Sequence, residues 1–405
     1  MAFNRTLMRV IVWMVASVFL LILLVTAGIA RLSNIWRAKL PRVVWGPTPI
    51  ISIKFWSDAL RHLGYQSKTL VYTIYPAYSR EDFDITIDDF RPRHRSLQFL
   101  RPYLVMVWCL MKFDLFVFFF DGGFLAQTPL ASFECQILKL AGKKLILTSY
   151  GSDIAVPEYL SFFREPILAH YPSLLERGPA IKQRVLYFTR YADLVIKNLQ
   201  VGFLPKYDFF WPSYLAIDVD LWKPNGQASS ADGQTGEIVV AHSSNHRLIK
   251  GTDDLIRAVR ELQQEGLKVR LALLEQCSNA EVRGSITNCD IFAEQFIGGY
   301  AMAAIEGMSL GKPVLSNLSC HDEELRNSPM LQECPIVDTS VETIKTNLRL
   351  LITDPELRRT LGAKSRGFVL KYHSYKAVGA IWDFLIRSVW NNKPLNVHQI
   401  LAMND

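Results

Sequence analysis

The stretch from Asp290 to Val314 has the pattern of a short strand, a glycine-rich turn and a helix. Gly298 and Gly299 allow the backbone to turn tightly and to approach a ligand closely. We expect the helix to run from about Tyr300 to Leu310, because Gly311 then stops it. Its free N–H groups point at the turn, and this arrangement suits phosphate binding. Taken alone, the pattern more often describes a buried strand–helix unit with a glycine C-cap.

A second stretch places basic residues at a comparable position. Glu237 to Ser244 has the pattern of a buried strand, and Asp253 to Glu265 has that of an amphipathic helix. Arg247 and Lys250 are expected in the loop between them. Ligands of open α/β sheets bind just beyond the carboxyl ends of the strands. Two cations in this loop, opposite a helix N-terminus, therefore predict a diphosphate clamp, with plain surface solvation as the alternative.

These two stretches together resemble a known family. His242 to Thr252 and Gln295 to Pro313 are similar to the donor-binding half of family-4 glycosyltransferases. That family has a basic pair before a Lys-Gly-Thr step, and a Glu-Ala-Met-type helix that ends in Gly-x-Pro. In this chain the helix reads Glu306-Gly-Met-Ser-Leu-Gly-Lys-Pro313. The resemblance is good over roughly residues 190 to 375 and looser before them.

The resemblance implies an α/β protein with two Rossmann-like domains, which is the GT-B architecture. It also implies transfer of a sugar from a nucleotide-diphosphate donor with retention of configuration, and no required metal or other cofactor. Cationic groups and a helix N-terminus then neutralise the leaving diphosphate, and a glutamate binds the ribose. The implied donor-binding residues are Arg247, Lys250, Gly298, Gly299, Tyr300 and Glu306.

The chain departs from the family at one donor position. The family commonly has two glutamates separated by seven residues; the second matches Glu306, but the first position holds Gly298. In the family the first carboxylate contacts the donor sugar. Glu294 and Gln295, in the preceding segment, are candidates to replace it. The loss keeps open the alternative of a non-catalytic relative that binds a glycan or a partner protein.

The first half of the chain contains candidate acceptor-side residues. After a strand at Lys144 to Thr148 the chain reads Ser-Tyr-Gly-Ser-Asp, where family members often have His-Gly-Ser-Asp. Tyr150 therefore replaces a histidine and is a candidate catalytic residue. It can hydrogen-bond a sugar, but it is a poor general base near neutral pH. Asp153 is a candidate catalytic residue or a turn residue. Gly46 and His242 are further candidates, with a Gly-Pro turn and a core histidine as the alternatives.

The N-terminal segment predicts a membrane anchor. Val10 to Ile29 is apolar and uncharged, and twenty such residues in a helix span a bilayer core. More basic residues follow it than precede it, which favours a single-pass protein with a cytoplasmic body. A cleaved signal peptide is the alternative. The flanking basic residues are Arg5 and Arg9 before the segment, and Arg31, Arg37, Lys39 and Arg42 after it.

Strand and helix patterns alternate along the rest of the chain and predict two doubly wound domains. We expect an anchor over 1–32, an acceptor-side domain over 40–223, and a nucleotide-sugar domain over 237–374. Pro224 to Gly236, rich in Ser, Gly and Gln, is the predicted linker. A last helix from Tyr375 to Val389, within 375–405, resembles the helix that returns to the first domain in the family.

The amino-acid composition limits the classes of partner that we expect for this chain. The formal charge of +7 comes without a nucleic-acid-binding signature, so we expect no nucleic acid and a basic face toward the membrane. The six cysteines lack metal-ligand spacing and are expected to be reduced. The absence of a Walker or Gly-x-Ser-x-Gly motif excludes the common NTPases and α/β-hydrolases. The expected partners are a nucleotide sugar and a glycan or lipid-linked acceptor; a nucleotide-sugar epimerase is a further alternative.

Overall fold

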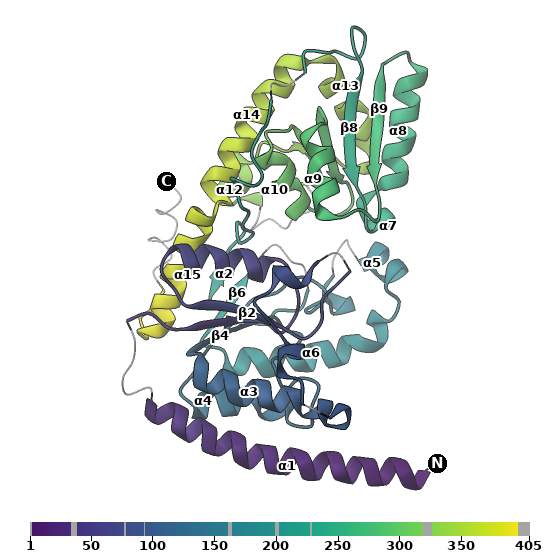
Figure 1. The fold of residues 1–405 in the computed structure, drawn as a ribbon. Coiled ribbons are helices and arrows are strands. Elements are labelled where there is room, and N and C mark those ends of the chain that lie inside the picture. The colour runs from purple at the N-terminus through teal and green to yellow at the C-terminus, as the bar shows by residue number, and fades with distance from the viewer. Residues whose placement is uncertain are drawn as a thin grey trace.

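The computed structural model describes residues 2–33, 39–76, 78–92, 94–160, 164–198, 202–226, 229–318 and 326–395. Arg37, Cys320 and the tail 396–405, which figure in the sequence-based expectations, lie outside these ranges. Two α/β domains are stacked on each other, with the N-terminal domain in purple to teal and the C-terminal domain mainly in green (Figure 1). The predicted α/β class with two Rossmann-like domains is therefore confirmed.

The N-terminal domain is built on a seven-stranded parallel sheet of order β3-β2-β1-β4-β5-β6-β7. Helices cover both faces, so the central strands are apolar throughout; all four residues of β4 are buried. The strands are β1 (Val43–Trp45), β2 (Ser67–Val71), β3 (Ile85–Thr86), β4 (Leu115–Phe118), β5 (Lys144–Leu147), β6 (Leu194–Lys197) and β7 (Phe209–Phe210).

The helices of this domain connect successive parallel strands. They are α2 (Ser52–His62), α3 (Arg101–Lys112), α4 (Glu134–Leu140), α5 (Arg164–His170) and α6 (Leu174–Tyr191). The segment 77–101, which has no clear sequence pattern, contains β3 and short 3-10 turns over Arg80–Asp82, Ile87–Phe90 and Arg95–Leu100. Asp82 and Asp89 cap the first two turns, each accepting a backbone N–H at 2.8 Å from the residue three positions before it.

The C-terminal domain has a five-stranded parallel sheet of order β12-β11-β10-β8-β9. Its strands are β8 (Ile238–Ser243), β9 (Val269–Leu274), β10 (Ile291–Gln295), β11 (Val314–Ser316) and β12 (Val337–Asp338). Its helices are α7 (Arg247–Lys250), α8 (Thr252–Gln264), α9 (Asn279–Thr287), α10 (Met302–Ser309), α12 (Pro329–Glu333), α13 (Ile344–Thr353) and α14 (Pro355–Tyr372).

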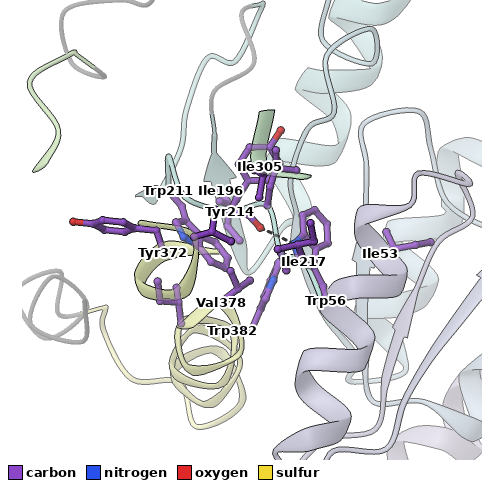
Figure 2. Close-up of a cluster of buried hydrophobic side chains, with 14 of the residues drawn as sticks. Ile53, Trp56, Ile196, Trp211, Tyr214, Ile217, Ile305, Tyr372, Val378 and Trp382 are labelled. Atoms are coloured by element: carbon purple, nitrogen blue, oxygen red, sulfur yellow. Dashed lines mark hydrogen bonds between the residues drawn. The ribbon is translucent and has the colours of Figure 1, made fainter. Parts of the chain in front are cut away.

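The last helix, α15 (Tyr375–Trp390), leaves the C-terminal domain and packs on α2 of the N-terminal domain (Figure 1). Its Trp382 ring lies 4.9 Å from that of Trp45, 5.4 Å from Trp56 and 5.3 Å from Trp211, measured between centroids. Figure 2 shows Trp382 among Trp56, Trp211 and Tyr214. These large buried rings fix the end of the chain to the first domain.

The N-terminal helix α1 (Ala2–Ser33) lies along the base of the N-terminal domain, next to α3 and α4 (Figure 1). Ala16, Leu23 and Ala27 are fully buried against this base, and the Phe19 ring stacks on Tyr103 at 4.6 Å. The opposite side of α1 exposes a continuous apolar face. Val10–Ser33, 24 residues, is long and apolar enough to cross a membrane by length and composition.

Candidate functional site

An internal ion pair lies at the carboxyl edge of the second sheet. Lys250, the last residue of α7, places its Nζ 3.3 Å from Oε1 of Glu294 on β10. The Glu294 side chain is fully buried, and its Oε2 accepts a hydrogen bond of 3.0 Å from Ser316 Oγ on β11. Burial raises the pKa of Glu294, and the neighbouring Lys250 opposes this shift. Glu294 thus holds Lys250 in place and does not itself face solvent.

Glu306 lies in α10, close enough to Lys250 and Glu294 for their charges to act on it. Its side chain is buried and hydrogen-bonds to Asn279 at the start of α9. Burial is the main reason why the pKa of Glu306 rises to about 7. A carboxyl group that titrates near neutral pH, next to a lysine and a helix N-terminus, is typical of a binding or catalytic site.

The glycine-rich turn connects β10 to α10 as predicted, although α10 begins at Met302 instead of Tyr300. Gln295 stabilises the turn by donating its side-chain amide to the Gly299 carbonyl. The Tyr300 side chain is buried, and its hydroxyl lies 3.1 Å from the sulfur of Met330. The N-cap residue of α10, Ala301, makes no side-chain capping bond, and its backbone N–H donates to the buried carboxylate of Glu294. The start of α10 therefore already attracts one anionic group.

Arg247 and Lys250 occupy a single helical turn, α7, and not the extended loop expected from the sequence. Gly251 ends this turn in the left-handed conformation, with φ of 67°, and α8 starts directly after it. Arg247 is partly exposed and forms ion pairs with Glu275, at 2.7 Å, and with Asp253. Both cations are therefore already paired with carboxylates. A diphosphate that binds here has to displace these carboxylates or share the cations with them.

His242 is a fully buried residue of β8. Its Nδ1 lies 2.8 Å from the Ala293 carbonyl, and its Nε2 lies 2.9 Å from Thr252 Oγ1. Burial lowers its pKa to about 4, so the ring is neutral at physiological pH. Both ring nitrogens are engaged inside the domain, where the histidine connects β8 to β10 and to the start of α8.

Asp153 is fully buried and stabilises the loop after β5 through hydrogen bonds. Its carboxylate accepts backbone N–H bonds from Phe120 at 3.1 Å, Tyr150 at 3.0 Å and Gly151 at 2.9 Å. Burial raises its pKa to about 7 despite these bonds. The side chain joins the ends of β4 and β5, which corresponds to the turn role weighed for it from the sequence.

Tyr150 belongs to a polar group with Asp121 and Arg184. Its hydroxyl donates to Asp121 Oδ2 at 2.5 Å, and Arg184 Nη2 lies 3.3 Å from Asp121 Oδ1. Burial, and next the charge of Asp121, raise the pKa of Tyr150 far above its ordinary value. Tyr150 is therefore a hydrogen-bond donor and not a base in this structure.

Gly46 is required by close packing of the backbone. Its φ is 152°, and a Cβ at this position would lie 1.9 Å from the Leu70 carbonyl oxygen on β2. Its own N–H donates to the Val117 carbonyl at 3.2 Å. The glycine thus serves the junction of β1, β2 and β4, as in the Gly-Pro-turn interpretation.

The residues around Glu306 in the C-terminal domain and those around Asp121 in the N-terminal domain face the same domain boundary. The pKa of Tyr78, after β2, is raised by burial and also by the charge of Glu306 in the other domain. Tyr171, after α5, places its hydroxyl 3.3 Å from Nδ1 of His246, directly before α7. The sequence gives no signal for Asn279, Ser316 or Tyr78, because their roles depend on contacts between distant segments.

The comparisons with known proteins bear on the fold. No family model and no curated protein matches the chain. Among solved structures, it is similar to a glycosyltransferase from Rickettsia africae ESF-5, with a TM-score of 0.53 at 12% identity over 88% of this chain and 100% of that one. The Anabaena protein HepE in complex with UDP gives a TM-score of 0.51 at 15% identity, over 85% and 99% of the two chains. The chain has the GT-B fold.

In the GT-B fold, the carboxyl edges of two Rossmann-like sheets meet at the domain boundary. Lys250, Glu294 and Glu306 come from one of these edges here, and Asp121 and Tyr150 from the other. Within the described ranges, no group of three or more His, Cys, Asp or Glu side chains is arranged to hold a metal ion.

Proposed function

We propose that this chain is a glycosyltransferase that moves a sugar from a nucleotide-diphosphate donor to a glycan or lipid-linked acceptor at a membrane. The observation that carries this proposal is the cluster of Lys250, Glu294 and Glu306 beside the N-terminus of α10. The fold shared with a Rickettsia glycosyltransferase and with an Anabaena protein that binds UDP supports it.

The donor diphosphate binds at the glycine-rich turn in this proposal. Lys250 and the amides at the start of α10 supply positive charge where the leaving diphosphate becomes more negative, and Arg247 reaches it from the outer side of α7. The backbone of Gly298, Gly299 and Tyr300 contacts the phosphates, and Glu306 binds the ribose hydroxyls. This protein charge stands in for a metal ion, so transfer is metal-independent and, as in the resembling family, retaining.

Calorimetry with UDP tests the donor site directly. The full-length chain in detergent is expected to bind UDP in EDTA-containing buffer, and Lys250→Ala is expected to lose most of the affinity. Hydrolysis of UDP-sugars by the wild type, followed by NMR of the first sugar formed, then tests transferase chemistry and its stereochemical course. Absence of UDP and other nucleoside-diphosphate binding would refute the proposal; an inverted anomer would refute retention only.

A non-catalytic membrane-bound relative is the second candidate. Gly298 stands where a donor-contacting glutamate is expected, and the buried Glu294 is committed to Lys250 and Ser316. Tyr150 also replaces the expected histidine. This candidate predicts nucleotide binding without hydrolysis of any nucleotide sugar, whereas an epimerase would release an altered sugar nucleotide without an acceptor.

We propose that α1 anchors the protein, with the body on the cytoplasmic side, where nucleotide sugars are made. The apolar Val10–Ser33 stretch supports an anchor, and the excess of basic residues after it supports this orientation. The acceptor is then presented to the N-terminal domain from the same membrane.

A further inference from the structure

Asp121 is a partly exposed carboxylate that the donor site does not use. It follows β4, at the carboxyl edge of the N-terminal sheet, and 29% of its side chain is exposed. Tyr150 and Arg184 hold one oxygen each, at 2.5 and 3.3 Å. A carboxylate has about four acceptor positions, so these two bonds leave capacity for a ligand hydroxyl.

The partners of Asp121 keep its carboxylate in one orientation. The Tyr150 ring packs edge-on against the buried Phe119, with centroids 5.2 Å apart. Arg184 donates both to Asp121 and, through Nε, to the Phe120 carbonyl. A guanidinium held by the Phe120 carbonyl and a phenol whose ring packs on Phe119 fix the two oxygens without covering the whole group.

The segment after β2, which contains Tyr75, lies against the segment after β4, which contains Asp121, because the Tyr72 hydroxyl donates to the Phe124 carbonyl at 2.5 Å. Tyr75 is 40% exposed, and the charge of Asp121 contributes to raising its pKa, after burial. The Tyr75 and Tyr78 rings are 6.4 Å apart, and Tyr78 in turn feels the charge of Glu306 across the domain boundary. Both tyrosines lie in the segment after β2, where the Tyr78 N–H donates to the Tyr75 carbonyl at 2.9 Å.

Exposed aromatic rings beside a fixed carboxylate suit a polyhydroxylated ligand. The C–H face of a pyranose can cover a ring, and a carboxylate accepts strong hydrogen bonds from hydroxyls. A phosphate or another anion is disfavoured next to Asp121. A peptide has no comparable set of hydroxyl donors.

We propose that Asp121, oriented by Tyr150 and Arg184, forms with Tyr75 a binding subsite for a sugar ring of the acceptor. This inference rests on the proposed glycosyltransferase function and adds the acceptor class and the residues that recognise it. Asp121 accepts a hydrogen bond from an acceptor hydroxyl, and Tyr75 covers an apolar face of the same ring.

Saturation-transfer NMR on the full-length chain in detergent micelles tests this subsite. The probes are methyl glycosides of glucose, galactose, mannose and N-acetylglucosamine, each offered with saturating UDP. The wild type is expected to transfer saturation to at least one of them. Asp121→Asn and Tyr75→Ala should each reduce that signal at least fivefold, while calorimetry shows an unchanged UDP affinity.

Asp88→Asn is the matched control. Asp88 is also an aspartate of the N-terminal domain that pairs with two arginines, Arg91 and Arg101, but it is 53% exposed and lies in a 3-10 turn after β3, three strands away from β4 in the sheet. Its glycoside signal should equal that of the wild type. If Asp121→Asn loses its fold, judged by thermal unfolding, the exposed Tyr75→Ala carries the test.

Two results would overturn the subsite. One is a glycoside signal that is the same in the wild type, Asp121→Asn and Tyr75→Ala. The other is a wild type that binds UDP but none of the four glycosides. A wild type that fails to bind UDP is recognised separately by calorimetry, and it would remove the proposed function together with this inference.

Discussion

Lys250 and Glu294 form an internal ion pair between residues 44 positions apart, with 3.3 Å between Nζ and Oε1. The Glu294 side chain is fully buried and that of Lys250 is 13% exposed. A carboxylate that cannot reach solvent thus holds the cation that faces the glycine-rich turn. A bound diphosphate shares this cation with Glu294, so the pair affects both affinity and stability.

Lys250→Met is expected to weaken UDP binding by tenfold or more and also to lower the melting temperature. A charge-assisted contact contributes about 1.5–3 kcal/mol, and about 1.4 kcal/mol corresponds to tenfold in affinity. The variant also leaves Glu294 buried without its cation, which is destabilising. Calorimetry and thermal unfolding measure the two effects, with the surface variant Lys345→Met as control. Wild-type affinity in Lys250→Met would exclude this lysine from the phosphate site.

Arg247→Ala is expected to weaken UDP binding while leaving the stability of the fold nearly unchanged. Its ion pairs with Asp253 and Glu275 are exposed, and such pairs contribute at most about 1 kcal/mol. The melting temperature should therefore stay close to that of the wild type, while UDP affinity falls and depends less on salt. Arg257→Ala removes a similar exposed arginine, paired with Asp254, and should leave both properties unchanged. An Arg247→Ala protein that matches Arg257→Ala in affinity would reduce the clamp to Lys250.

Glu306→Gln should remove a pH dependence. Burial raises the pKa of Glu306 to about 7, above the ordinary value of about 4.3. The stability that the protonated group contributes is complete below pH 4.3 and is lost as pH rises through 7. The ionised form binds ribose hydroxyls better, so UDP affinity should rise across pH 6–8 in the wild type and stay flat in Glu306→Gln. Turnover should fall more in Glu306→Gln than in Glu294→Gln; near-wild-type turnover in both would contradict the carboxylate roles.

Asp153→Asn is expected to act mainly on folding. Three backbone N–H groups donate to this carboxylate, and an amide in its place presents N–H donors to at least one of them. A buried group without its partner costs about 1–3 kcal/mol. Thermal unfolding should show this loss, and UDP affinity well below the melting temperature should be normal. A fully stable but inactive Asp153→Asn would instead assign the residue a catalytic role.

The proposed membrane anchor predicts how the protein behaves in cell fractionation. Residues 1–33 should keep the protein in the membrane through high-salt and carbonate washes, because hydrophobic burial is insensitive to both. Proteases should digest the body only after spheroplasts are lysed. Deleting 1–33 should release a body that still binds UDP, because none of the proposed donor-site residues lies in the deleted segment. Digestion of the body from outside intact spheroplasts would reverse the proposed orientation.

Local patterns were sufficient to predict most of the fold. The helix α8 and the strand β5 lie where the sequence predicts them. The pattern was insufficient for α7, a single turn whose end depends on the left-handed conformation of Gly251. It also missed the two-residue strand β7, which is too short for a periodic signal.

The site was predictable only where its residues form one contiguous motif. Gly298, Gly299 and Glu306 lie in one strand–turn–helix unit, so their proximity follows from the sequence. The pairing of Tyr150 with Asp121 joins two different strand ends, 29 residues apart. No local pattern records such a contact, because it arises from the order of strands in the sheet.

The tryptophan cluster around Trp382 has a consequence for biosynthesis. Trp45, Trp56 and Trp211 belong to the first domain, but the ring that completes their packing is translated only after the second domain. Domains commonly fold one after another as they leave the ribosome. In this chain the core of the first domain lacks the Trp382 ring until the second domain has been translated. A nascent chain released before α15 would expose that core, and cellular quality control would recognise it as incomplete.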